Sequence, residues 1–227
     1  MRTTALELSG GKDSVACLYL LRDQLDDITV YWLNTGDIFP ETRAVINECK
    51  KIIPHFVEVF SDVGAWRLNH GVPSDVVPMT GEHVHLPLAE KDIRVVDSYT
   101  CCAHNIMIPL HERVMADGNT TIIRGQKTAD QHKSPVRSGD VIDGITFLFP
   151  VEDWSDEKVM RYLRDQKAPI HPAYLTGKHG ADCMHCTGWW AHSNPELLAN
   201  YPRSSGYVTT VQDVIKRMIK ERLDALC

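Results

Sequence analysis

The sequence lacks any apolar run of about 18 residues, the length that crosses a bilayer, so we expect no membrane span. It lacks the pattern of a secretory signal, because a strand-like pattern begins near residue 3; we therefore expect a cytoplasmic protein. It also lacks a basic excess. With 24 Lys and Arg against 30 Asp and Glu, the net charge of −6 argues against a general binder of nucleic-acid backbones.

Hydrophobic residues, in contrast, are plentiful. They make up 43% of the 227 residues, which is enough to bury the core of one good-sized domain with an appendage. The chain also has seven cysteines. In a cytoplasmic protein, cysteines in this number indicate metal or redox chemistry more than a disulfide framework.

A glycine-rich turn, Ser9-Gly10-Gly11-Lys12-Asp13-Ser14, separates a strand expected over residues 3–8 from a helix expected over residues 15–21. The glycines allow a positive φ and close approach of a ligand, and a helix N-terminus attracts anions, phosphates above all. Lys12 adds a positive charge, and the two serines add hydroxyl groups that can cap the helix. The spacing is too short for a Walker-type P-loop and differs from GxGxxG. The alternative is an ordinary turn with polar helix caps.

Strand and helix patterns alternate along most of the chain. Strands are expected over residues 27–33, 56–60, 120–123 and 145–150, and helices over residues 40–53, 101–115 and 154–165. The alternation predicts an α/β fold with a doubly wound, mostly parallel sheet over residues 1–190, followed by a helical extension over residues 191–227. Ligands bind at the carboxyl ends of such strands. We therefore expect Thr35 and Gly36, after the second strand, to line a nucleotide pocket with the glycine-rich turn.

Three other stretches are harder to assign. Residues 61–100 are interrupted by prolines and glycines, which indicates a long loop or lid. Its histidines, His70, His83 and His85, are interpreted as loop residues because no third metal ligand is evident nearby. The loop over residues 124–137 carries four basic residues after a strand, which is the place for an anionic ligand, although a solvated charged loop is the alternative. The last helix, expected from about Thr210, has an apolar face suited to packing or to a homodimer.

Four of the cysteines form a second pattern. Cys101 and Cys102 are adjacent, and 80 residues separate Cys102 from the pair Cys183 and Cys186, which have Cys-x-x-Cys spacing. Four thiolates suit either zinc or a 4Fe–4S cluster. Adjacent ligands are awkward for tetrahedral zinc, but the residues alone leave the metal open. The alternative is four buried thiols with no metal.

These motifs resemble those of a known family. The turn Ser9–Ser14 resembles the SGGxDS PP-loop of the adenine-nucleotide α-hydrolase superfamily. The Cys-Cys and Cys-x-x-Cys pairs resemble the cluster motif of adenylyl-sulfate (APS) reductases, which belong to the phosphoadenylyl-sulfate (PAPS) reductase family in that superfamily. Three more segments match in the same order: Asn34–Thr42 resembles DTG…FPET, residues 125–137 resemble a GxRxxQSxxR loop with an insertion and with Lys127 where arginine is usual, and Pro150–Ser155 resembles PLxxWs.

The resemblance implies a set of site residues. A 4Fe–4S cluster would be held by Cys101, Cys102, Cys183 and Cys186, with zinc as the alternative. An adenine nucleotide (APS, PAPS or ATP) would be held by residues of the turn, of the second strand end and of the basic loop: Ser9, Gly10, Gly11, Lys12, Asp13, Ser14, Thr35, Gly36, Gly125, Lys127 and Arg137. Lys12 would also act in catalysis.

Three functions follow from this resemblance. The first is reduction of an adenylyl sulfate to sulfite, with electrons from a thioredoxin-like reductant. Reductases of the family usually lack the lysine of the loop and carry a nucleophilic cysteine in a C-terminal tail; here the only late cysteine is Cys227, a tentative nucleophile. The second is splitting of ATP, with Mg²⁺, into AMP and pyrophosphate for sulfur transfer to tRNA or DNA, which the intact Lys12 favours. The third is an inactive nucleotide-binding module.

Overall fold

The computed structural model describes residues 3–76, 84–87, 92–130, 135–176, 182–190 and 195–225. The chain forms two compact units, each assembled from separate segments. The first unit comprises Met1–Asn34, Pro40–Phe60 and Pro109–Pro172, and the second comprises Thr35–Phe39, Ser61–Ile108 and Ala173–Cys227. The expected division into residues 1–190 and 191–227 stays a prediction.

The first unit is built on a six-stranded sheet of order β3-β2-β1-β7-β9-β8. Five strands run parallel, and β8 pairs with β9 in the antiparallel sense. The strands are β1 (Thr4–Glu7), β2 (Ile28–Asn34), β3 (Phe56–Phe60), β7 (Thr121–Ile123), β8 (Val141–Ile142) and β9 (Ile145–Leu148). This arrangement confirms the predicted α/β class with a mostly parallel sheet.

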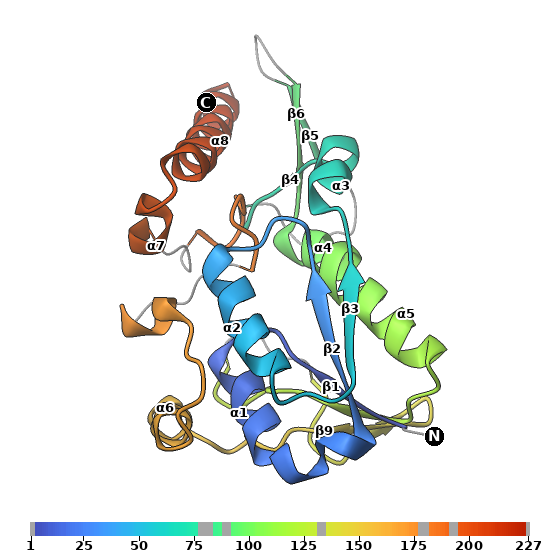
Figure 1. The fold of residues 1–227 in the computed structure, drawn as a ribbon. Helices are drawn as coiled ribbons and strands as arrows, with labels where there is room; N and C mark the ends of the chain where they lie inside the picture. Colours follow the sequence, from blue (N-terminus) through green and yellow to red (C-terminus); the bar gives the residue numbers. More distant parts are fainter. Residues whose placement is uncertain are drawn as a thin grey trace. The chain divides into compact units, whose positions relative to one another are not determined.

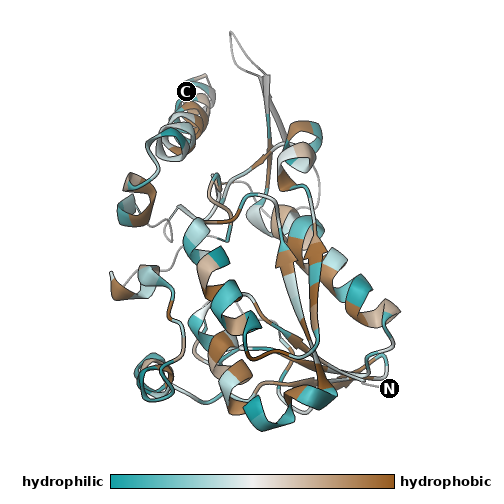
Figure 2. Cartoon of the chain, viewed as in Figure 1, coloured by the Kyte–Doolittle hydropathy of each residue, from teal (hydrophilic) through white to brown (hydrophobic). Residues whose placement is uncertain are grey.

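Helices cover the sheet of the first unit on both faces. Figure 1 shows α1 (Lys12–Leu20) and α2 (Pro40–Lys50) on one face and α5 (Ile108–Ala116) on the other, which is the arrangement that right-handed crossovers produce. The fourth helix, α6 (Asp156–Asp165), contacts α1. A 3₁₀ helix, η1 (Arg22–Asp27), precedes β2. Apolar side chains of the central strands, such as Leu6 and Val30, are fully buried, and brown stretches follow these strands in Figure 2.

The second unit contains a three-stranded sheet of order β4-β6-β5. Its elements are α3 (Val63–His70), β4 (Val72–Pro73), β5 (Val84–Pro87), β6 (Asp92–Val96), α4 (Ser98–Cys102), the π-helical turn η2 (Ala103–Met107), the 3₁₀ helix η3 (Pro172–Leu175), α7 (Pro195–Ala199) and α8 (Pro202–Asp224). The expectation that residues 61–100 form a long loop is therefore wrong. Pro73 and Pro87 lie at the ends of β4 and β5, where the missing N–H costs no ladder hydrogen bond.

Two histidines of that stretch lie in regular structure. His70 ends α3, where its ring stacks on Trp66 with centroids 4.6 Å apart and its Nδ1 lies 2.9 Å from the Trp66 carbonyl oxygen. His85 lies in β5, and His83 is outside the described residues. The interpretation of His70 as a loop residue is thus wrong, and its contacts are those of a packed helix end.

The last helix, α8, begins at Pro202 and not near Thr210. Pro202 occupies the first helical turn, where its fixed φ is favourable. Ile215 is fully buried against Val95 of β6, together with Val211 and Ile219 of the same helix. The apolar face of α8 therefore packs within the second unit. None of the helices in the described residues is long and apolar enough to cross a membrane.

Candidate functional site

The glycine-rich turn connects β1 to α1 in the first unit. Gly10 has φ +84°, a conformation that side chains rarely adopt, which explains a glycine there. The two serines do not cap α1, whose N-cap is Gly11 without a side-chain bond. Instead the Ser9 and Ser14 hydroxyl oxygens lie 3.0 Å apart, Ser14 Oγ donates to the Gly11 carbonyl at 3.0 Å, and Ser9 Oγ accepts from the Gly11 N–H at 3.2 Å. The serines thus hold the turn in shape.

Gly125, after β7, lies directly against this turn. A Cβ at this position would be 2.4 Å from the backbone nitrogen of Ser14 and 2.5 Å from the carbonyl carbon of Asp13. Because only glycine permits such an approach, the loop after β7 and the turn after β1 meet backbone to backbone. The structure therefore brings Gly125 to the turn, and its role in nucleotide binding stays a prediction.

Two lysines and three aspartates form a charged cluster beside the turn. Lys12 Nζ lies 2.8 Å from Asp13 Oδ2 and 3.1 Å from Asp156 Oδ1. Lys127 Nζ lies 2.9 Å from Asp13 Oδ1, 3.1 Å from Asp130 Oδ1 and 2.9 Å from Asp156 Oδ1. One oxygen of Asp156 therefore accepts from both ammonium groups, and the five groups together carry one net negative charge.

Burial differs sharply within this cluster. The side chains of Lys12 and Lys127 are 4% and 2% exposed, whereas that of Asp156 is 53% exposed. Burial alone would lower the pKa of Lys127, but its bonds to Asp13, Asp156 and Asp130 raise that pKa above the ordinary value. Burial opposes ionisation of Asp156, yet Lys127 and Lys12 lower its pKa. Lys127 and Asp156 are thus charged at neutral pH.

The two arginines of the basic loop have carboxylate partners of their own. Arg137 Nη1 donates to Thr128 Oγ1 at 3.1 Å and lies 3.5 Å from Glu152 Oε1, with the side chain half-exposed. Arg124 forms a two-bond pair with Glu7, at 2.5 and 3.0 Å. Arg124 therefore serves the end of β1, and Arg137 remains the more accessible of the two. Residues 131–134 of this loop lie outside the described residues.

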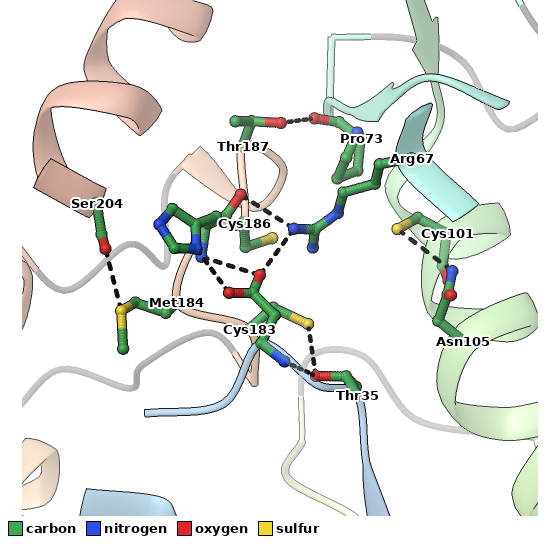
Figure 3. Close-up of polar contacts among 12 residues, drawn as sticks. Thr35, Arg67, Pro73, Cys101, Asn105, Cys183, Met184, Cys186, Thr187 and Ser204 are labelled. Atoms are coloured by element: carbon green, nitrogen blue, oxygen red, sulfur yellow. Dashed lines mark hydrogen bonds and ion pairs between the residues drawn. The ribbon is translucent and has the colours of Figure 1, made fainter. Parts of the chain in front are cut away.

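Three cysteines of the second unit lie in one buried cluster. Cys101 of α4 and Cys183 pack with Val63 and Val96, and Cys186 packs against the same group. Figure 3 shows the Arg67 guanidinium reaching among these sulfur atoms. Cys183 Sγ is 3.5 Å from Thr35 Oγ1, and Cys186 Sγ is 3.7 Å from the Gly188 carbonyl oxygen. Cys101 of α4 thus lies together with Cys183 and Cys186 of the segment before α7.

Arg67 is held by a hydrogen-bonded network that sequence reasoning missed. Its Nη1 donates to Asp37 Oδ2 at 2.9 Å and to the His185 carbonyl oxygen at 3.2 Å. Asp37 Oδ1 lies 2.6 Å from His185 Nδ1, and the Asp37 carbonyl accepts from Met184 N–H at 2.6 Å. Asp37 follows directly on the Asn34-Thr35-Gly36 motif, which was the available signal. Nothing in the sequence marked Arg67.

Without a metal, the thiols of the four cysteines Cys101, Cys102, Cys183 and Cys186 are protonated at neutral pH. Burial raises the pKa of Cys186 to about 11 and that of Cys102 to about 12. Burial also raises the pKa of Cys101 and Cys183, and the positive charge of Arg67 opposes both shifts. Metal binding would deprotonate such thiols, and Arg67 would offset part of the resulting negative charge.

The chemistry of these donors fits zinc or a 4Fe–4S cluster. In addition, Arg67 Nε is a buried donor with no hydrogen-bond partner among the described residues. Over the same part of the chain, however, no three His, Cys, Asp or Glu side chains are placed so as to hold a metal ion. The ligand set Cys101, Cys102, Cys183 and Cys186 therefore stays a prediction.

Thr35, Gly36 and Cys227 are the remaining predicted site residues. Thr35 and Gly36 belong to the second unit, where the Thr35 hydroxyl accepts from the Asp37 N–H at 3.3 Å and contacts Cys183. Their nucleotide role stays a prediction. Cys227, the tentative nucleophile, lies outside the described residues.

Comparison with known proteins gives related sequences across most of the chain. A family model described as phosphoadenosine phosphosulfate reductase domain matches residues 3–64. The chain is 25% identical over 194 residues to the phosphoadenosine 5′-phosphosulfate reductase of Proteus mirabilis, covering 84% of this chain and 73% of that protein. It is 26% identical over 187 residues to the same-named protein of Xylella fastidiosa, covering 81% of this chain and 72% of that protein.

Two solved structures share the fold. A phosphoadenylyl-sulfate reductase from Candida auris, in a phosphate complex, aligns with a TM-score of 0.57 and 12% identity, over 82% of this chain and 83% of that chain. The U34-tRNA thiolase NcsA from Methanococcus maripaludis, with its 4Fe–4S cluster, aligns with a TM-score of 0.50 and 13% identity, over 93% of this chain and 71% of that chain. The chain is therefore similar to phosphoadenosine 5′-phosphosulfate reductases over more than four-fifths of its length, and it shares its fold with these two solved structures.

Proposed function

We propose that this chain is an enzyme that binds an adenine nucleotide at the turn Ser9–Ser14. The observation that carries the proposal is the pair of buried ammonium groups, Lys12 and Lys127, which share one oxygen of Asp156 at 3.1 and 2.9 Å. Two cations held together beside a glycine-rich strand-to-helix turn suit an anionic group with several oxygens. Gly125 gives the turn its close backbone neighbour, and Arg137 supplies a further, accessible positive charge.

The cysteine cluster of the second unit is the proposed cofactor site. Cys101, Cys102, Cys183 and Cys186 would hold a 4Fe–4S cluster, with zinc as the alternative. Such a cluster supplies a redox-active or charge-tuning group when it is bound. The contribution of the chain itself is the positive charge of Arg67, which Asp37 and His185 hold in place at the thiols.

Reduction of an adenylyl sulfate is the reaction that we favour. The substrate would accept two electrons from a thioredoxin-like dithiol, the bond between sulfur and the phosphate oxygen would break, and sulfite and an adenosine phosphate would leave. The relatives that cover more than four-fifths of the chain are named phosphoadenosine 5′-phosphosulfate reductases, which supports this choice. The substrate, APS or PAPS, depends on whether a 3′-phosphate is accepted.

The second candidate is splitting of ATP into AMP and pyrophosphate, for sulfur transfer to tRNA or DNA. The specific observation in its favour is that Lys12 is present in the turn and lies with Lys127 at a common carboxylate oxygen. Two ammonium groups would stabilise the charge that develops on departing pyrophosphate. Mg²⁺ would accompany ATP in that reaction.

One experiment distinguishes the two candidate reactions. Anaerobically purified protein is offered APS, PAPS or Mg·ATP, with a dithiol reductant and a tRNA or DNA acceptor, while sulfite and pyrophosphate are measured. Sulfite from APS or PAPS supports the reductase, pyrophosphate from ATP supports the second candidate, and nucleotide binding without either product would leave a binding module. Lys12→Met should abolish the product, whereas Lys51→Met, at a lysine that is 67% exposed, should not.

The cofactor has its own test on the same preparation. Iron, zinc and sulfide are counted, and the visible absorbance of the protein is compared with that of Cys183→Ser. Brown absorbance that disappears in the variant supports the 4Fe–4S cluster. Colourless protein with stoichiometric zinc supports the alternative.

A further inference from the structure

We propose that Asp156 is a competing counter-ion, which an anionic nucleotide must displace from Lys12 and Lys127 in order to bind. This inference rests on the proposed nucleotide site and assigns its affinity control to one carboxylate. The geometry that carries it is the single Asp156 oxygen that lies within 3.1 Å of both ammonium groups.

The donors of Lys127 are fully used. A lysine ammonium has three N–H groups, and Lys127 Nζ lies within 3.1 Å of one oxygen from each of Asp13, Asp130 and Asp156. Its side chain is 2% exposed, so solvent has little access to the ammonium group. A nucleotide oxygen can therefore gain a bond from Lys127 only if one of the three carboxylates gives one up.

Of the three carboxylates, Asp156 requires the least free energy to displace. Asp13 bridges the two lysines with both of its oxygens, at 2.8 and 2.9 Å. Asp130 also accepts from the backbone N–H of Lys127 at 2.7 Å, so it is fixed to the loop. Asp156 reaches the lysines through one oxygen, and its side chain is 53% exposed, against 17% for Asp13 and 31% for Asp130.

The place of Asp156 in the fold permits this movement. It is the first residue of α6, after the N-cap Ser155, whose side chain accepts from the Lys158 N–H. The helix is thus capped without the Asp156 side chain, which can rotate into solvent while α6 stays intact. In solvent at a helix N-terminus, a carboxylate remains in a favourable electrostatic position.

The substitution Asp156→Asn tests the proposal directly. The amide keeps the size of the side chain but removes the charge that competes for the lysines. We expect ATP and APS to bind about tenfold more tightly, equivalent to about 1.4 kcal/mol, by calorimetry in the presence of a chelator and again with Mg²⁺. Asp156→Ala is the second variant, and circular dichroism verifies that each variant is folded.

Glu157→Gln is the matched control. It removes the same charge from the same turn of α6, but Glu157 is fully exposed and forms no ion pair with either lysine in the described structure. We expect its affinities to equal those of the wild type. A purely structural role of Asp156 would weaken binding in the variants, so the direction of the change separates the two roles.

Three other outcomes would overturn the inference. Equal affinities in wild type and Asp156→Asn would leave the nucleotide site standing and remove the competition. Weaker binding in the variant with Mg²⁺ alone would make Asp156 a metal-binding residue instead. Absence of binding in the wild type and in both variants would overturn the nucleotide site and the inference together, whereas binding in the variants alone would support both.

Discussion

The close approach of Gly125 to the turn after β1 leads to a prediction with a defined size. In Gly125→Ala, the new Cβ would lie 2.4 Å from the backbone nitrogen of Ser14, whereas about 3 Å is the shortest tolerable separation. One of the two backbones must then move by about 0.6 Å or more, and overpacking of this kind costs about 1–3 kcal/mol. No flexible side chain lies there to give way, because the nearest atoms belong to the backbone of Asp13 and Ser14.

We expect urea denaturation to show a lower free energy of unfolding for Gly125→Ala, and thermal unfolding to show a loss of about 2–4 °C for each kcal/mol. Gly206→Ala is the control, since Gly206 lies in α8 with no atom within 4 Å of an added Cβ. There the same change removes a flexible residue from a helix and should raise stability by about 0.5–1 kcal/mol. A Gly125→Ala protein within about 0.5 kcal/mol of wild type would refute the backbone contact.

The remaining predictions concern titration and side-chain shape. Burial raises the pKa of Cys17 and of Cys49 to about 12, so about one thiol in 10⁴ is ionised at pH 8. Iodoacetamide should therefore label both cysteines only after unfolding, and rapid labelling of the native protein would contradict this. Burial lowers the pKa of His171 below its ordinary 6.5, so the unfolded chain binds the proton more readily and stability falls as the pH drops below about 6.5. In His171→Gln, the urea midpoint should fall less over that range. In Lys127→Arg, a flat guanidinium replaces an ammonium that contacts three carboxylates at 2% exposure, and the free energy of unfolding should drop by about 1–3 kcal/mol in urea denaturation.

Local patterns were sufficient to predict the sheet of the first unit. The strand expected over residues 56–60 is β3, and the helix that opens with Pro40 is α2, because strand alternation and a proline in a first helical turn depend on neighbouring residues. The prediction of a long loop over residues 61–100 was wrong for a physical reason. Strands β4, β5 and β6 are two to five residues long and are stabilised by pairing across the sheet, such as Val72 with Val95, which a sequence does not display.

The charged cluster shows the same division between local and distant information. Lys12, Gly125 and Lys127 lie in motifs that the sequence exposes. For Asp156 the sequence predicts only a place at the start of the helix expected over residues 154–165, where the helix dipole favours an acidic residue. Its role depends on the contact between α1 and α6, elements separated by more than 130 residues. The neutralisation of Lys12 and Lys127 by Asp156 cannot be deduced from two motifs that do not contain this carboxylate.

This neutralisation changes what the presence of Lys12 indicates about the substrate. Considered from the sequence motif alone, the positive charge of Lys12 favours a pyrophosphate leaving group. In the structure, its ammonium is bonded to Asp13 and Asp156, within a cluster whose net charge is −1. If Asp156 must be displaced, that cost is the same for either ligand and lowers both affinities equally. The choice then depends on the charge that each ligand places against two ammonium groups. An adenylyl sulfate places one negative charge on its terminal sulfate, and ATP places more on its terminal phosphates. The feature that favours ATP is therefore the pair formed by Lys12 and Lys127, and Lys12 alone does not decide between a reductase and an ATP-splitting enzyme.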